Sequence, residues 1–133
     1  MSTDKVDENA VRELIENWAR SVRERNMDGI LASHARDIVM FDVPPPRVSR
    51  GIEAYRETWS LFYTSQAEPI AFDIQELDVV AGAKVAFAVA LMQCAVKGRM
   101  GEREPLDFRL TVGLRKEDER WIVVHEHHSI PAT

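Results

Sequence analysis

The stretch that decides the fold reads Phe108-Arg-Leu-Thr-Val-Gly-Leu-Arg-Lys-Glu-Asp-Glu-Arg-Trp-Ile-Val-Val-His-Glu-His-His-Ser129. Apolar and β-branched residues alternate with polar ones on both sides of a short charged segment, Glu117–Glu119. Alternation with a period of two is typical of half-buried strands, and a charged break between two such runs favours a turn. The stretch therefore predicts two strands folded back on each other, with three of the four histidines in the second strand.

Upstream of this hairpin, the pattern indicates helices followed by further strands. The expected helices span 4–25, a short segment carrying Ile30, Leu31 and His34, and a segment from about 51 to 65; the expected strands span 38–43, 69–80, 83–97, 105–116 and 120–130. The three prolines at 44–46 interrupt this order as a rigid loop. Helices followed by a run of antiparallel strands predict an α+β fold, with the helices packed on one face of a curved sheet.

Composition limits the classes of protein. A chain of 133 residues that is 45% hydrophobic and 29% charged predicts one globular domain over 1–133. The net charge of −5 argues against nucleic acid or a membrane surface as a partner, because both require clustered cations. The single cysteine, Cys94, excludes an intrachain disulfide. The polar N-terminus does not resemble a signal peptide, so a cytoplasmic location is expected; without a nucleotide fingerprint, no cofactor is expected.

The strand expected over 85–95 is apolar on both faces. Large residues alternate there with alanines, and the sequence reads Val-Ala-Phe-Ala-Val-Ala-Leu-Met-Gln-Cys-Ala. A strand that is apolar on both faces is covered on both faces. Since the helices can cover only one, we expect a homodimer that forms through the outer face of the sheet.

The order of these elements resembles the nuclear transport factor 2-like superfamily. The segments Arg109–Lys116 and Arg120–Pro131 are similar to the ending of its SnoaL-like and ketosteroid isomerase-like bacterial branch. The resemblance implies a cone-shaped half-barrel, with a curved antiparallel sheet wrapped around two or three N-terminal helices. It also implies an apolar pocket and, usually, dimers. The branch includes isomerases, polyketide cyclases, dehydratases and ligand binders, and the ending is also similar to a kinase association domain.

The resemblance assigns a candidate role to Asp42. The segment Ala35–Asp42 matches the steroid isomerases without gaps, and Asp42 then falls on their catalytic base. Their oxyanion-hole tyrosine falls on Trp18, and their second donor falls near Thr111 or Val112, where this chain has no carboxyl group. One of the three catalytic parts is thus retained. An aspartate at an apolar pocket mouth suits a general base next to a carbonyl group.

Two histidines of the last strand are the other catalytic candidates. His125 and His127 lie two apart, so they share one face, and this is the face expected for Trp121 and Val123. The bulk of those neighbours indicates that the face is covered. If the opposite face looks inward, His128 is the candidate instead. A hydrogen-bonding role in the sheet or dimer is the alternative. Two imidazoles alone do not form a metal site, and none is predicted.

Further candidates for ligand binding come from the helices and from the strand expected over 105–116. Trp18, Tyr55 and Trp59 lie at core spacing, and one or two of them are expected to line a cavity. Arg109 and Thr111 share a strand face. We expect Arg109 to need an anion, either Glu126 or Asp107 of the chain or a small acidic ligand.

These residues leave three hypotheses open. The protein is a cofactor-independent isomerase, cyclase or dehydratase with Asp42 as general base on a small apolar carbonyl compound. Alternatively, it binds a small acid through Arg109 without turnover, or it is a homo-oligomeric assembly domain. The position of Asp42 relative to a histidine or an arginine in the pocket separates the three.

Overall fold

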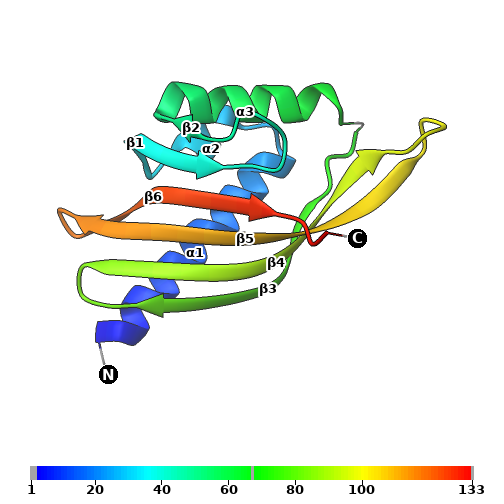
Figure 1. Ribbon diagram of the computed structural model, residues 1–133. Coiled ribbons are helices and arrows are strands. Elements are labelled where there is room, and N and C mark those ends of the chain that lie inside the picture. Colours follow the sequence, from blue (N-terminus) through cyan, green and yellow to red (C-terminus); the bar gives the residue numbers. More distant parts are fainter. Residues whose placement is uncertain (1–2, 67, 133) are drawn as a thin grey trace.

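The computed structural model describes residues 3–66 and 68–132, which form helices and one sheet (Figure 1). The elements are α1 (Thr3–Arg23), α2 (Met27–Leu31), β1 (His34–Phe41), β2 (Ser49–Arg50), α3 (Ile52–Thr64), β3 (Phe72–Ala81), β4 (Val85–Lys97), β5 (Arg103–Glu117) and β6 (Arg120–Ser129). The predicted helices and long strands are confirmed, with ends shifted by a few residues. His34, expected in the short helix, instead begins β1.

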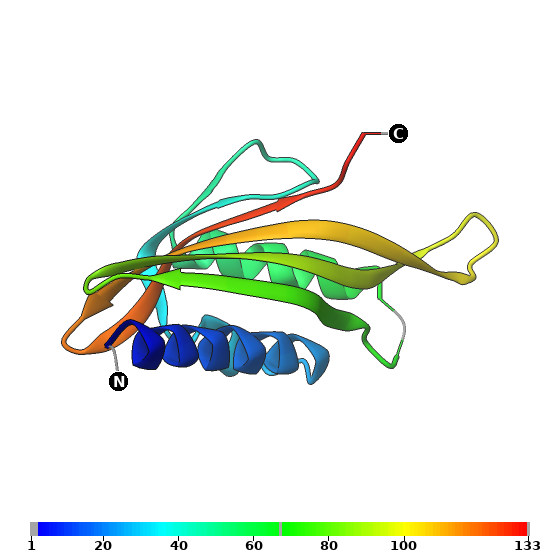
Figure 2. The ribbon, with the colours of Figure 1, turned by 90° about the horizontal axis from the view of Figure 1, so that it is seen from below.

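The sheet is curved and unclosed, with the strand order β2-β1-β6-β5-β4-β3. α1 packs against β3 and α3 packs against β1, so the sheet wraps around the helix layer (Figures 1 and 2). The predicted α+β half-barrel is confirmed. The neighbours β3 to β6 pair antiparallel as expected, but β1 pairs with β6 in parallel. No helix among the described residues is long and apolar enough to span a membrane.

The two faces of β4 have different surroundings. Ala86, Ala88 and Ala90 point into the core, where their small side chains leave room for the helix layer. The alternating large residues point outward and are exposed, with Val85 65% and Phe87 48% accessible. The structure therefore confirms that β4 is apolar on both faces, and it leaves the large side chains of the outer face exposed.

A β-bulge interrupts the pairing of β5 with β6. Gly113 is opposite His125, but the next residue, Leu114, is opposite Val123, so β6 has one extra residue. An extra residue reverses which side chains point inward beyond the bulge. Trp121 and Val123 are buried before it, and the buried residues after it are Glu126 and His128. The expectation that His125 and His127 share the covered face of Trp121 and Val123 is therefore wrong.

Candidate functional site

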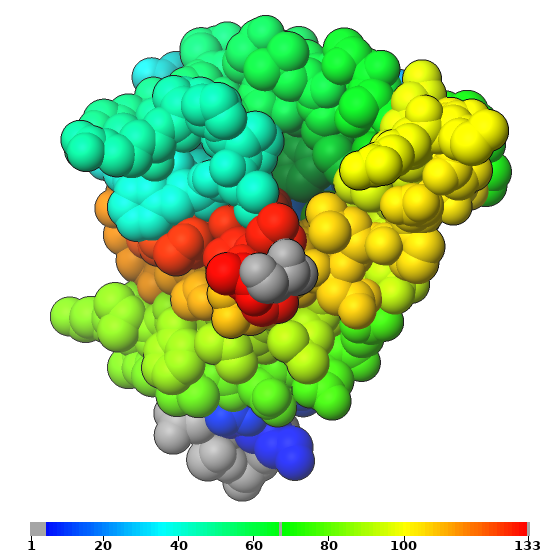
Figure 3. Space-filling view, turned by 45° about the vertical axis from the view of Figure 1, so that its right-hand side comes forward, coloured from blue at the N-terminus to red at the C-terminus, as the bar shows by residue number. Residues whose placement is uncertain are grey.

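A cavity of about 540 Å³ opens between α3, the proline loop after β1 and the inner faces of β4, β5 and β6. Figure 3 shows the hollow below α3 (green), with the proline loop (cyan) and the β4–β5 hairpin (yellow) on its two sides. Most of the lining is apolar, including Met40, Trp59, Phe62, Phe72, Leu106 and Phe108. Such a cavity has the size and character of a small-molecule site.

Asp42 lies at the wall of this cavity formed by the proline loop. It follows directly after the end of β1, where the prolines prevent the strand from continuing. Its Oδ1 accepts a hydrogen bond of 2.8 Å from the backbone N–H of Val43. Among the described residues, no other hydrogen bond or ion pair engages this carboxylate. Within the described residues, Oδ2 of Asp42 is therefore left for a ligand, and its role as a base stays a prediction.

His128 lies in the same cavity wall, on β6. Its ring stacks on Phe108 at a centroid distance of 5.6 Å, and Trp18 and Trp59 contact it edge to face. The Nε2 atom is 3.0 Å from Oε1 of Glu126. The imidazole is thus fixed on three sides by aromatic rings and at one nitrogen by a carboxylate.

Behind the cavity, Glu126 is the centre of a buried polar network. Its Oε2 accepts a hydrogen bond of 2.7 Å from the Tyr55 hydroxyl and lies 2.9 Å from Nε2 of His34. The indole N–H of Trp18 donates to the Tyr55 oxygen at 2.9 Å. Every polar atom of this carboxylate therefore has a partner, although the residue is only 1% exposed.

The pKa values of the network follow from burial and from these partners. Burial raises the pKa of Glu126, but the hydrogen bonds from His128 and His34, together with electrostatic attraction, outweigh it and lower the pKa from 4.5 to about 2. Burial, and then the negative charge of Glu126, raise the pKa of Tyr55 well above its ordinary value. Glu126 is therefore the ionised member of the pair and Tyr55 keeps its proton.

The structure brings together some of the candidate residues and separates others. Trp59 lines the cavity, while Trp18 and Tyr55 belong to the network behind it. His125 and His127 lie on the outer face of the sheet, where Phe41 packs edge-on against both rings. Nδ1 of His125 is 2.7 Å from the carbonyl oxygen of Val39.

Arg109 and Thr111 also lie on the outer face and are exposed. Arg109 donates from Nε to the Ser129 hydroxyl at 3.1 Å and pairs with neither expected carboxylate. Asp107 instead accepts a hydrogen bond from Gln93. The expectation of a buried, anion-paired arginine is wrong, because the outer face of β5 is open to water.

The sequence pattern did not indicate His34 as a site residue, it favoured His125 and His127 over His128, and it suggested Glu126 only as a partner of Arg109. The bulge in β6 is the reason for the last two, since strict alternation assigns them to the outer face. A buried carboxylate requires paired donors, and the neighbouring His128 was the one signal of this in the sequence. Among the described residues, no group of three or more His, Cys, Asp or Glu side chains is arranged to hold a metal ion.

Comparison with known proteins agrees with this architecture. The SnoaL-like domain family matches residues 11–133, and the chain belongs to this family. The structure is similar to an NTF2-like protein of unknown function from Pseudomonas putida KT2440, with 32% identity, a TM-score of 0.88, and coverage of 99% of this chain and 92% of that chain. No functionally curated protein matches the chain by sequence.

Two more distant structures share the fold. A ketosteroid isomerase-like protein from Erwinia carotovora atroseptica is 16% identical, with a TM-score of 0.77 and coverage of 95% of this chain and 98% of that chain. An NTF2-like protein with a cystatin-like fold from Novosphingobium aromaticivorans is 13% identical, with a TM-score of 0.80 and coverage of 96% and 85%. The family match and the 32% identical structure confirm the predicted superfamily, and these two structures agree in fold.

Proposed function

We propose that this protein is an enzyme that moves a proton on a small, neutral carbonyl compound without a cofactor. One observation carries the proposal: Asp42 and His128 line the same apolar cavity. Asp42 removes a proton from the carbon next to the carbonyl group, and His128 serves a second proton transfer at an oxygen of the substrate. Isomerases, cyclases and dehydratases share the first of these steps. His128 takes the role that the sequence pattern assigned to His125 or His127.

The charges of the cavity favour a neutral ligand. Its charged lining residues among those described are two carboxylates, Asp42 and Glu57, and no lysine or arginine lines it there. An anionic ligand would be desolvated next to like charges without a compensating cation. The hypothesis of an acid bound through Arg109 lacks support, because that side chain lies on the other face of the sheet.

Proton removal can be tested before the natural substrate is known. The bicyclic ketone 2-tetralone is apolar and has acidic protons next to its carbonyl group, and mass spectrometry follows their exchange in deuterated water. We expect the protein to accelerate this exchange and Asp42→Asn to abolish the acceleration while leaving the fold intact. The matched control is Asp37→Asn, which removes an exposed β1 carboxylate outside the cavity. Equal acceleration by both variants would exclude Asp42 as the base.

A ligand carrier without turnover is the alternative use of the same cavity. Such a carrier would bind 2-tetralone, as seen by quenching of tryptophan fluorescence, without accelerating its exchange. Trp59 lines the cavity and provides the signal.

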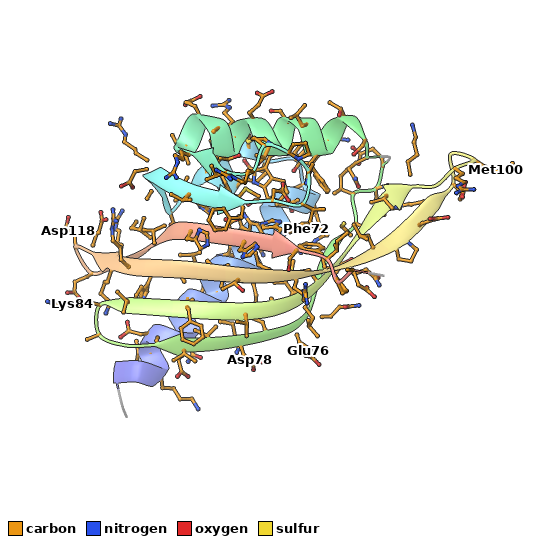
Figure 4. All side chains as sticks on the ribbon, viewed as in Figure 1. Phe72, Glu76, Asp78, Lys84, Met100 and Asp118 are labelled. Carbon is orange, nitrogen blue, oxygen red and sulfur yellow. The ribbon has the colours of Figure 1, made fainter. Side chains whose placement is uncertain are left out.

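The exposed stripe of β4 supports a homodimer as the second part of the proposal. Val80 of β3 extends the stripe, which the acidic Glu76 and Asp78 flank on one side and Arg109 of β5 on the other. Figure 4 shows Glu76 and Asp78 side by side on β3. A second copy rotated about an axis along β4 would place its basic strand opposite this acidic strand, so charge and apolar surface match together. The cytoplasmic location expected from the sequence also stays a prediction.

A further inference from the structure

The two nitrogens of His34 both face hydrogen-bond acceptors. Nδ1 lies 2.7 Å from the carbonyl oxygen of Ala32, and Nε2 lies 2.9 Å from Oε2 of Glu126. A carbonyl oxygen can only accept, and so can an ionised carboxylate. Both nitrogens of His34 therefore carry a proton, and the ring is a buried imidazolium.

The Tyr55 hydroxyl does not change this assignment. It lies 2.7 Å from Oε2 of Glu126 and 3.1 Å from Nε2 of His34. Its single proton goes to the nearer and charged acceptor, because hydrogen bonds to a carboxylate are the stronger ones. The indole N–H of Trp18 occupies a lone pair of the same hydroxyl.

The charge of the network is then balanced without His128. The negative charge of Glu126 is matched by the imidazolium of His34, at a site where both side chains are at most 2% exposed. A second buried positive charge would have no second carboxylate in the network to balance it, so His128 is neutral at rest. Its one proton lies on Nε2, because this nitrogen faces the Oε1 acceptor of Glu126 at 3.0 Å.

The remaining nitrogen of His128, Nδ1, is open to the cavity. It makes no hydrogen bond within the described residues. Among these residues, Trp59 Nε1 is the one side-chain nitrogen or oxygen that is both fully buried and without a partner, so Nδ1 of His128 is not fully buried. Nδ1 of His128 is therefore within reach of solvent, and His128 lines the cavity. A bare ring nitrogen accepts a hydrogen bond and can take up a proton.

We propose that Glu126 and His34 are positioning residues that hold His128 as a neutral imidazole with a bare Nδ1, so that the cavity selects a neutral ligand carrying a hydroxyl group. The substrate class becomes a hydroxylated or enolic carbonyl compound, since both Asp42 and His128 present acceptors. When Nδ1 takes up the proton of an enolic hydroxyl, the electron pair of the O–H bond forms the carbonyl group, and the enol carbon takes up a proton from Asp42, which is a carboxylic acid after the first proton removal. The new imidazolium is stabilised by Glu126, as in triads in which a carboxylate orients a histidine. This step rests on the proposed acid–base function, whereas the proton positions do not.

The proton positions can be measured in the wild-type protein alone. Long-range ¹H–¹⁵N NMR correlations of the imidazole rings distinguish protonated from bare nitrogens, and the variants His34→Gln and His128→Gln assign the signals. We expect two protonated nitrogens on His34 and a proton only on Nε2 of His128 at neutral pH. A proton on Nδ1 of His128, or a neutral His34, would overturn the inference.

The variant Glu126→Gln tests the cause of this arrangement. An amide nitrogen in place of Oε1 donates, so we expect the proton of His128 to move to Nδ1. The matched control His127→Gln changes a histidine of the outer face and should leave both rings as in the wild type. An unchanged His128 ring in folded Glu126→Gln would show that Glu126 does not position it.

Ligand choice is tested with 2-naphthol and its methyl ether, which differ in one hydroxyl proton. We expect 2-naphthol to bind about tenfold more tightly to the wild type, and the difference to vanish in His128→Gln. Equal affinity of the two probes for the wild type would refute the selection of a hydroxyl group. The expected proton positions and probe preference, with 2-tetralone exchanged equally fast by the wild type and Asp42→Asn, would instead exclude Asp42 as the base and keep this inference.

Discussion

Glu126 determines how the free energy of unfolding falls at acidic pH. Its pKa is about 2 in the folded protein against an ordinary value of 4.5. A folded-state pKa below the unfolded one means that stability is fully present above about pH 4.5 and is lost as the pH falls toward 2. A gap of about 2.5 pH units, at about 1.4 kcal/mol per unit, corresponds to about 3 kcal/mol.

The perturbation is Glu126→Gln, which removes the titrating group and keeps the shape of the side chain. Urea unfolding followed by tryptophan fluorescence, at fixed protein concentration, gives the free energy of unfolding at each pH from 5 down to 2. Imidazoles of the unfolded chain are already protonated in this range. We expect the wild type to lose about 3 kcal/mol more than the variant over this interval.

The matched control is Glu76→Gln, which removes an exposed carboxylate from β3. Its free energy of unfolding should fall with pH as steeply as that of the wild type. If the wild type and Glu126→Gln lose stability in parallel, Glu126 is not the ionised centre of the buried network.

Three further predictions concern the cavity and the outer face. Replacing Asp42 by Asn should lower the exchange of 2-tetralone at least about a hundredfold, the usual contribution of a general base, and leave the circular dichroism spectrum unchanged. The change Phe87→Glu should convert the proposed homodimer to a monomer in light scattering, whereas Val6→Glu, at an exposed apolar position on α1, should not. A dimer of the Phe87→Glu variant would exclude the β4 stripe as the interface. Burial raises the pKa of the Cys94 thiol to about 11, so its alkylation by iodoacetamide should stay slow up to about pH 9, and rapid labelling at neutral pH would contradict its buried position.

Local sequence patterns were sufficient for most of the fold. The helical period of 4–25 and the alternation of large residues with alanines in 85–91 each reflect which side chains meet water, and the structure has them as expected. The pairing of β1 with β6 could not be read this way. It joins His34 to Val123 across most of the chain, and no local pattern specifies such a parallel contact.

The candidate site was predicted only in part, because only some of its residues are indicated by a local pattern. Asp42 sits where a strand ends at a proline loop, which is a local signal. The inward direction of His128 depends on one extra residue in β6, and alternation alone assigns it to the wrong face. The local pattern placed His34 in the short helix, whereas in the structure it begins β1 and meets the buried carboxylate.

The carboxylate of Glu126 joins side chains from α1, β1, α3 and β6 through Tyr55 and the histidines. Detaching any one of these elements would leave a buried polar group without its partner, so they are expected to open only together. Figure 4 places Met100 at the tip of the β4–β5 hairpin, which contributes no side chain to these hydrogen bonds. Amide hydrogens at the rear of the cavity should therefore exchange with solvent only through global unfolding, while those of the hairpin tip exchange freely. We therefore expect local opening to be confined to the mouth of the cavity, so that a ligand can enter without displacing His128.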